Sequence, residues 1–115
     1  MALLDELKLN GCDVDSGIER FMGNAAIYEK MIRKLPESIK KQNVKTVFES
    51  GNSEDAINAT HAIKGTSGNL SITPIYEAYA KMVELLRAGS FEEAHTLYIN
   101  TIPVEEKILN IIERA

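Results

Sequence analysis

The sequence has little of several features that would direct a protein to a membrane, to an oxidising compartment or to nucleic acid. Its one cysteine, Cys12, has no partner for an internal disulfide, which fits a reducing compartment. No uninterrupted apolar run approaches the roughly 18 residues of a membrane span, and the N-terminus lacks the basic start and apolar centre of a signal peptide. The net charge is −4, whereas nucleic-acid binding normally needs a basic excess. We therefore expect a cytoplasmic protein with neither a membrane nor nucleic acid as its partner.

Strand signals are also nearly absent, whereas helical periodicity runs through the whole chain. The first expected segments are a short helix over 3–9 and a short turn capped by Asp15 or Ser16 through Phe21. A long helix is expected from about Asn24, which Pro36 kinks or divides and which resumes to Phe48, followed by a helix from Ser53 that bears His61. Next come a helix capped by Thr73 that stops at 88–89 and a last helix with a Ser90–Glu93 capping box and a bend at Pro103. The tyrosines and methionines stand at helical spacing and are expected in the core or at its boundary. Four long amphipathic helices with short connections pack best antiparallel. The predicted fold is all-α, an antiparallel up-down four-helix bundle with one or two short N-terminal helices, in a single domain over 1–115.

The segment Ala59–Leu70 carries two opposed helical faces. One face is small or apolar and consists of Ala56, Ala59, Ile63, Thr66, Ser67 and Leu70, while the opposite face holds His61, Lys64, Gly65 and Gly68. Two glycines inside a helix together lower its stability by roughly 2 kcal/mol relative to alanine. Packing on an exposed face gives no reason for this loss. Removing two side chains beside an imidazole lets the backbone of another macromolecule come close. For Gly68, a role as the helix C-cap is the alternative.

This face suits a histidine that carries a phosphoryl group. A neutral ring nitrogen is a good nucleophile near neutral pH, and the N–P bond that it forms is labile. Lys64, three residues after His61, projects on the same side and can offset the charge of the phosphoryl group, while Gly65 leaves room for a partner. Ile57, one turn earlier, is either an exposed docking residue or is partly covered by the short N-terminal helices. The chain has no Gly-rich phosphate loop, so nothing indicates a nucleotide site.

The order His61, Lys64, Gly65, Thr66, Ser67, Leu70 resembles the motif of histidine-containing phosphotransfer (HPt) domains, the phosphorelay intermediates of two-component signalling. The segment 13–24 (DVDSGIERFMGN) is similar to the N-terminal segment of that family, where an acidic residue, a glycine and an aromatic residue lead into the first long helix. There are two departures: Ser71 stands where the family often has glycine, and Gly68 stands where alanine or serine is commoner.

The resemblance implies a phosphocarrier rather than an enzyme. His61 would exchange a phosphoryl group with an aspartate of a response-regulator receiver domain, or accept it from a sensor or hybrid histidine kinase. Lys64 would stabilise the phosphoryl charge, Gly65 would give the partner access, and Ile57 and Gly68 would contact the partner. No cofactor is expected on this chain, because Mg²⁺ and the catalytic groups would belong to the partner. We expect the chain to act as a monomer.

Other interpretations of the sequence remain. The chain could be a receiver-binding module of the same fold that is not phosphorylated, or an unrelated helical adaptor. His95 falls beside apolar positions and is expected to pack structurally, and a metal site built from His61, His95 and Cys12 lacks the usual ligand spacing. Basic residues cluster in mid-chain as a solvated helix face or a docking patch for an acidic receiver: Lys30, Arg33, Lys34, Lys40, Lys41 and Lys45.

Overall fold

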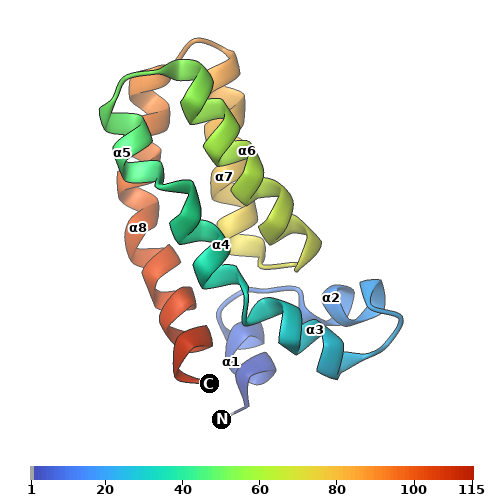
Figure 1. Cartoon of the computed structure of the whole chain (residues 1–115). Coiled ribbons are helices and arrows are strands. Elements are labelled where there is room, and N and C mark those ends of the chain that lie inside the picture. Colours follow the sequence, from blue (N-terminus) through green and yellow to red (C-terminus); the bar gives the residue numbers. More distant parts are fainter. Residues whose placement is uncertain (1) are drawn as a thin grey trace.

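The computed structural model describes residues 2–115, which fold into helices without any strand (Figure 1). The helices are α1 (Leu3–Leu9), α2 (Val14–Arg20), α3 (Ala25–Ile32), α4 (Leu35–Gln42), α5 (Val44–Glu49), α6 (Ser53–Asn69), α7 (Thr73–Arg87) and α8 (Phe91–Arg114). None of the helices in this described part is both long enough and apolar enough to cross a membrane. The prediction of an all-helical protein is therefore confirmed.

The three longest helices, α6, α7 and α8, run side by side along an elongated molecule of 40 × 25 × 21 Å (Figure 1). Helix α7 packs against both α6 and α8, and α4 and α5 pack against α6. The core between them contains large, fully buried side chains, among them Phe48, Ile63, Tyr79, Met82 and Ile108. Burial of such a core is the main favourable contribution to folding.

The prolines act differently in the two helices where they were expected to matter. Pro36 divides the predicted long helix: α3 ends at Ile32, and α4 begins at Leu35 with Pro36 in its first turn. A proline is tolerated there because its missing N–H would lack a helical partner anyway. Pro103, in contrast, lies inside α8, which continues through it to Arg114.

Two predicted helix caps are wrong, because the residues involved lie inside the helix, one or more positions after the N-cap. Asp13, rather than Asp15 or Ser16, caps α2: its side chain accepts a hydrogen bond from the Ser16 N–H at 3.2 Å. Thr73 is the first residue inside α7 and does not cap it. Its hydroxyl oxygen instead accepts a hydrogen bond from the Asp13 N–H at 3.1 Å, so this side chain joins two distant segments.

Two further expectations also fail. Ser90 occupies the N-cap position of α8, but its side chain makes no capping hydrogen bond, so the predicted capping box is absent there. Met22 is not a core residue: it is 97% exposed, in the turn between α2 and α3. Three of the tyrosines follow the prediction, since Tyr28, Tyr79 and Tyr98 are buried, whereas Tyr76 is 38% exposed.

The N-terminal segment closes one end of the α6–α7 pair. The Tyr28 hydroxyl donates to the carbonyl oxygen of Leu70 at 2.6 Å, and the Asp13 N–H donates to the carbonyl oxygen of Ser71 at 3.1 Å. Ser71 has φ of 53°, a left-handed conformation that glycine adopts more readily. Two carbonyl groups at the end of α6 thus find their partners in the first 28 residues of the chain.

Candidate functional site

Helix α6 has the two opposed faces that the sequence predicts. Ala56, Ile63 and Ser67 are almost fully buried, whereas His61 is exposed in the middle of the helix. The buried hydroxyls do not weaken this packing, because they donate within the helix: Thr60 Oγ1 to the Ala56 carbonyl at 2.8 Å and Ser67 Oγ to the Ile63 carbonyl at 2.7 Å. The small buried face therefore allows the neighbouring helices to approach while His61 points away from them.

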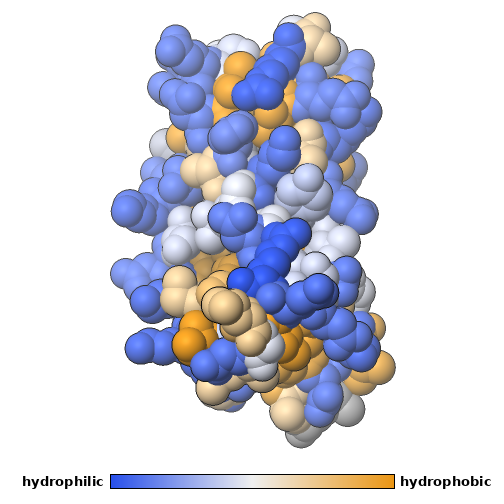
Figure 2. Space-filling model, turned by 90° about the vertical axis from the view of Figure 1, so that its right-hand side faces the viewer, coloured by the Kyte–Doolittle hydropathy of each residue, from blue (hydrophilic) through white to orange (hydrophobic). Residues whose placement is uncertain are grey.

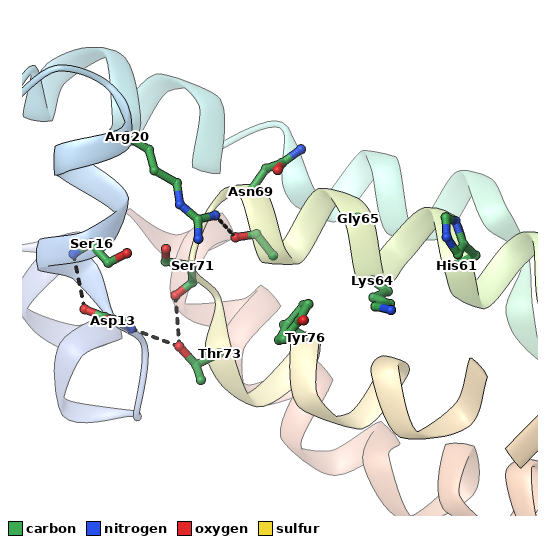
Figure 3. A pocket seen from close by; sticks show the side chains of 11 residues that line it. Asp13, Ser16, Arg20, His61, Lys64, Gly65, Asn69, Ser71, Thr73 and Tyr76 are labelled. Atoms are coloured by element: carbon green, nitrogen blue, oxygen red, sulfur yellow. Dashed lines mark hydrogen bonds between the residues drawn. The ribbon is translucent and has the colours of Figure 1, made fainter. Parts of the chain in front are cut away.

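The exposed side of α6 forms one wall of an open groove of about 420 Å³, with α2 at one end and α7 along the other wall (Figure 3). His61, Lys64 and Gly65 line one end of the groove, and Arg20 and Asn69 line the other. Figure 2 shows the molecule from the side on which α2 and α3 project, with a pale, mildly polar zone across the middle and more apolar surface gathered below it. The structure thus brings His61, Lys64 and Gly65 together, as the sequence predicts.

The two glycines of α6 have different surroundings. A Cβ atom added at Gly65 would meet nothing within 4 Å, so the missing side chain leaves open space beside His61. A Cβ atom added at Gly68 would lie 2.8 Å from Cδ1 of Tyr76. The prediction that neither glycine is needed for packing is therefore wrong for Gly68. Its alternative role as C-cap is also wrong, because α6 ends at Asn69 with Leu70 as the C-cap.

Among residues 2–115, no side chain forms a hydrogen bond or ion pair with the His61 ring or the Lys64 ammonium group. Lys64 is half-buried, and no ion pair joins it to a carboxylate among residues 2–115. The same part of the chain supplies no hydrogen bond to the His61 ring. A nucleophilic ring and a cation therefore face the groove with their polar atoms available to a partner.

Ile57 fits neither of the interpretations made from the sequence. It is half-buried and packs against the core, so it is not the exposed aliphatic residue that the spacing suggests. Nor do the N-terminal helices cover it, because their contacts are with the opposite end of α6, where Arg20 bonds to Gly68 and Tyr28 bonds to Leu70. Only its remaining exposed surface is accessible to a partner.

Arg20, like Tyr76, is a groove residue that sequence reasoning missed. Its guanidinium reaches across from α2 and donates a hydrogen bond to the Gly68 carbonyl, near the C-terminal end of α6 (Figure 3). A cation is favourable at that end because the helix dipole is negative there. The two residues are 48 positions apart, so no local pattern could have indicated the contact.

The remaining candidates from the sequence, His95 and Cys12, are packing residues. The His95 ring stacks on Phe48 with centroids 5.1 Å apart and planes within 3°, which confirms its expected packing role. Cys12 is buried, and this burial raises the pKa of its thiol to about 11, so the thiol is unsuited to nucleophilic attack near neutral pH. Within residues 2–115, no group of three His, Cys, Asp or Glu side chains is placed to hold a metal ion.

The mid-chain basic cluster is exposed and partly paired with acidic residues. Arg33 forms an ion pair with Glu29 at 3.0 Å, and Lys40 forms one with Glu113 at 3.2 Å. These contacts lower the net positive charge of the cluster, which favours the solvated face over the docking patch.

Comparison with protein-family models, with curated proteins and with solved structures finds no match to this chain. The geometry of α6 and its groove therefore carries the functional conclusion.

Proposed function

We propose that this chain is a histidine phosphocarrier of a two-component phosphorelay, with His61 as the phosphoacceptor. The observation that carries the proposal is the combination at mid-α6: an exposed imidazole, a lysine one turn along the same side, and open space at Gly65. Exposure of a nucleophile on a rigid helix, with room for a second protein, is what a carrier needs. A residue kept only for packing would not need that space.

The chemistry requires little from this chain. In acceptance, a neutral ring nitrogen of His61 attacks the phosphorus of an aspartyl phosphate on a receiver domain. The N–P bond forms as the P–O bond to the carboxylate breaks, and the carboxylate leaves with the electron pair. Lys64 offsets the negative charge of the phosphoryl group, and donation to a second receiver is the same step in reverse. The partner supplies Mg²⁺ and the groups that position the phosphoryl group during its transfer.

We also propose that α6, α7, α8 and the α4–α5 pair form the antiparallel four-helix bundle typical of HPt domains. The side-by-side course of the three longest helices and the packing of α4 and α5 on α6 support it. Such carriers work in the cytoplasm as monomers between a sensor or hybrid histidine kinase and a response regulator, and we propose the same setting here.

The test uses phosphoramidate, a small-molecule donor that phosphorylates histidine without a partner protein. We expect one acid-labile, alkali-stable phosphate per chain in the unmodified protein and in His95→Gln, the matched control. His61→Gln is expected to lose labelling completely while its melting temperature is unchanged, because an exposed side chain contributes little to stability. Labelling of His61→Gln would move the acceptor to another residue. Absence of labelling in the unmodified protein, together with tight binding of a receiver domain, would favour a module that docks receivers without being phosphorylated.

A further inference from the structure

The end of the groove away from His61 carries a charge that the proposed phosphotransfer chemistry does not use. Gly68 is seven positions after His61, which places the Arg20 contact about 10 Å along the helix axis from the acceptor histidine. A hydrogen bond spans about 3 Å between heavy atoms. Arg20, held at the Gly68 carbonyl, is thus too far away to bind a phosphoryl group on His61.

Within the part of the chain that the structure describes, Arg20 is also not neutralised by a carboxylate. Arg33 and Arg114 each form an ion pair with a glutamate, at 3.0 and 3.5 Å, but among residues 2–115 no carboxylate pairs with Arg20. The guanidinium has five N–H donors, and one of them is occupied by the Gly68 carbonyl. Donors therefore remain for a second acceptor at an exposed position in the groove.

The charge of the groove is opposite in sign to that of the whole chain. Lys64 and Arg20 contribute two positive charges to its lining, against one negative charge from Asp13, on a protein with a net charge of −4. The Asp13 carboxylate is already engaged, because it caps α2 through the Ser16 N–H. A partner that covers the groove thus meets a local cationic surface on an otherwise acidic molecule, and complementary charge at such a surface selects among partners.

We propose that Arg20 is a specificity-determining residue for the receiver domain: it binds a carboxylate side chain that the receiver carries outside its own phosphorylation site. This inference rests on the proposed function, because the receiver must cover His61 for the second contact to form. Arginine suits the role, since its planar guanidinium can bind a carboxylate through two parallel hydrogen bonds. The contact fixes the orientation of a correct receiver over His61 and leaves a receiver without that carboxylate facing an unpaired cation.

The experiment labels the domain with phosphoramidate and measures transfer to receiver domains from the genome that encodes this chain. The receiver with the fastest transfer is then titrated against unmodified protein, Arg20→Glu, Arg20→Lys and Arg87→Glu. Arg87 is the matched control, since it is an exposed arginine at the far end of α7. We expect Arg20→Glu to raise the KM for the receiver at least tenfold, with the rate at saturation within twofold. Arg87→Glu should stay within threefold of the unmodified protein. Arg20→Lys keeps the charge but loses the two parallel hydrogen bonds, so its KM should lie between those of the unmodified protein and Arg20→Glu.

A charge exchange identifies the receiver residue. Each exposed Asp or Glu around the receiver's phosphorylation site is changed to Arg in turn, and one of these variants should restore a low KM with Arg20→Glu. An unchanged KM for Arg20→Glu would overturn the inference, as would a lowered melting temperature that accounts for the loss of transfer. Both results leave labelling of His61 intact, so they leave the proposed function standing. Failure of phosphoramidate labelling would overturn the proposed function, and this inference with it.

Discussion

Gly65 and Gly68 stand one turn apart on the same side of α6, yet only one of them is required by the domain itself. The space beside Gly65 is empty to 4 Å, whereas the space beside Gly68 is filled by the ring of Tyr76, and the Gly68 carbonyl is bonded by Arg20. The first half of this face is open to a partner. The second half is built into the contact between α6, α7 and the N-terminal helices. Two glycines on one face of α6 thus have different roles, one leaving space for a partner and the other packing against Tyr76. Measuring the stability of variants at each position distinguishes these roles.

The largest expected effect on stability is at Gly17 of α2, at the end of the α6–α7 pair that the N-terminal segment closes. A Cβ atom there would overlap the ring of Tyr28, which is fully buried and whose hydroxyl donates to the Leu70 carbonyl. We expect Gly17→Ala to lower the free energy of unfolding by about 3 kcal/mol, from overpacking and loss of the hydrogen bond. Urea denaturation measures this change. An unaltered midpoint would show that α2 is not pressed against Tyr28, and the closed end would lose its main support.

Gly68→Ala is expected to cost less, because Tyr76 is 38% exposed and its ring can move outward. Overpacking costs about 1–3 kcal/mol, and the higher helix propensity of alanine returns up to about 1 kcal/mol. We therefore expect a net loss of about 1 kcal/mol by thermal denaturation. Adding Tyr76→Ala supplies the control: in the double variant the Gly68→Ala change should become neutral or stabilising. A cost that persists without the tyrosine ring would contradict the assigned contact.

Gly65→Ala should change the free energy of unfolding in the opposite direction and stabilise the domain. With nothing near the added methyl group, we expect a gain of up to about 1 kcal/mol in the free energy of unfolding from helix propensity alone. Gly65→Leu should retain stability while slowing transfer between His61 and a receiver, because the larger side chain fills the space beside the imidazole. The two measurements are made on the same variant. Lower stability with unchanged transfer would mean that Gly65 is a packing residue like Gly68.

The smallest expected effect is a dependence of the stability on pH, which comes from Glu105. The buried Tyr79 hydroxyl donates to Glu105 Oε1 at 2.5 Å. Burial raises the pKa of the Glu105 carboxyl above its ordinary range, although the hydrogen bond from Tyr79 opposes the shift. An acid with a raised folded pKa binds more protons in the folded state, so its contribution to stability falls as pH rises from the ordinary glutamate value through the folded pKa.

Glu105→Gln keeps an oxygen to accept the Tyr79 hydrogen bond and removes the titration. We expect this variant to be as stable as the unmodified protein at pH 7 or slightly more stable, by less than about 1 kcal/mol. Its melting temperature should also decline less between pH 5 and pH 7.5. A steeper decline in the variant would reverse the assigned direction. The glycine variants are best compared at one fixed pH.

The sequence predicts the helices of this fold well because apolar spacing is a local property. Periodicity placed α1, α6 and α7 close to their observed bounds, and Pro36 marked the division between α3 and α4. The sequence does not predict the second break, at Asn43 between α4 and α5, since the apolar pattern runs on to Phe48. The caps were less predictable because a capping side chain has other partners to choose from. Thr73 uses its hydroxyl for the Asp13 N–H, 60 residues away, rather than for its own helix.

The same distinction explains which parts of the candidate site were found. His61, Lys64 and Gly65 lie within one helical turn or so, and a helix of known pitch puts them on one side. Arg20 and Tyr76 reach the groove from α2 and α7, so their positions depend on tertiary packing. Their absence from the prediction also led to the wrong interpretation of Gly68, since the ring that fills its space could not be placed.

The two ends of the helical chain lie together, where α1 packs against α8 and Arg114 approaches Glu6 at 3.5 Å (Figure 1). A tether attached at either end therefore leaves from the same pole of the molecule. Immobilised on a sensor surface through one end or the other, the domain would present its groove to a flowing partner in a similar orientation. Two fluorophores at the ends would report almost nothing about bending of the long helices, so one of them belongs at the opposite pole, in the α7–α8 connection at Gly89.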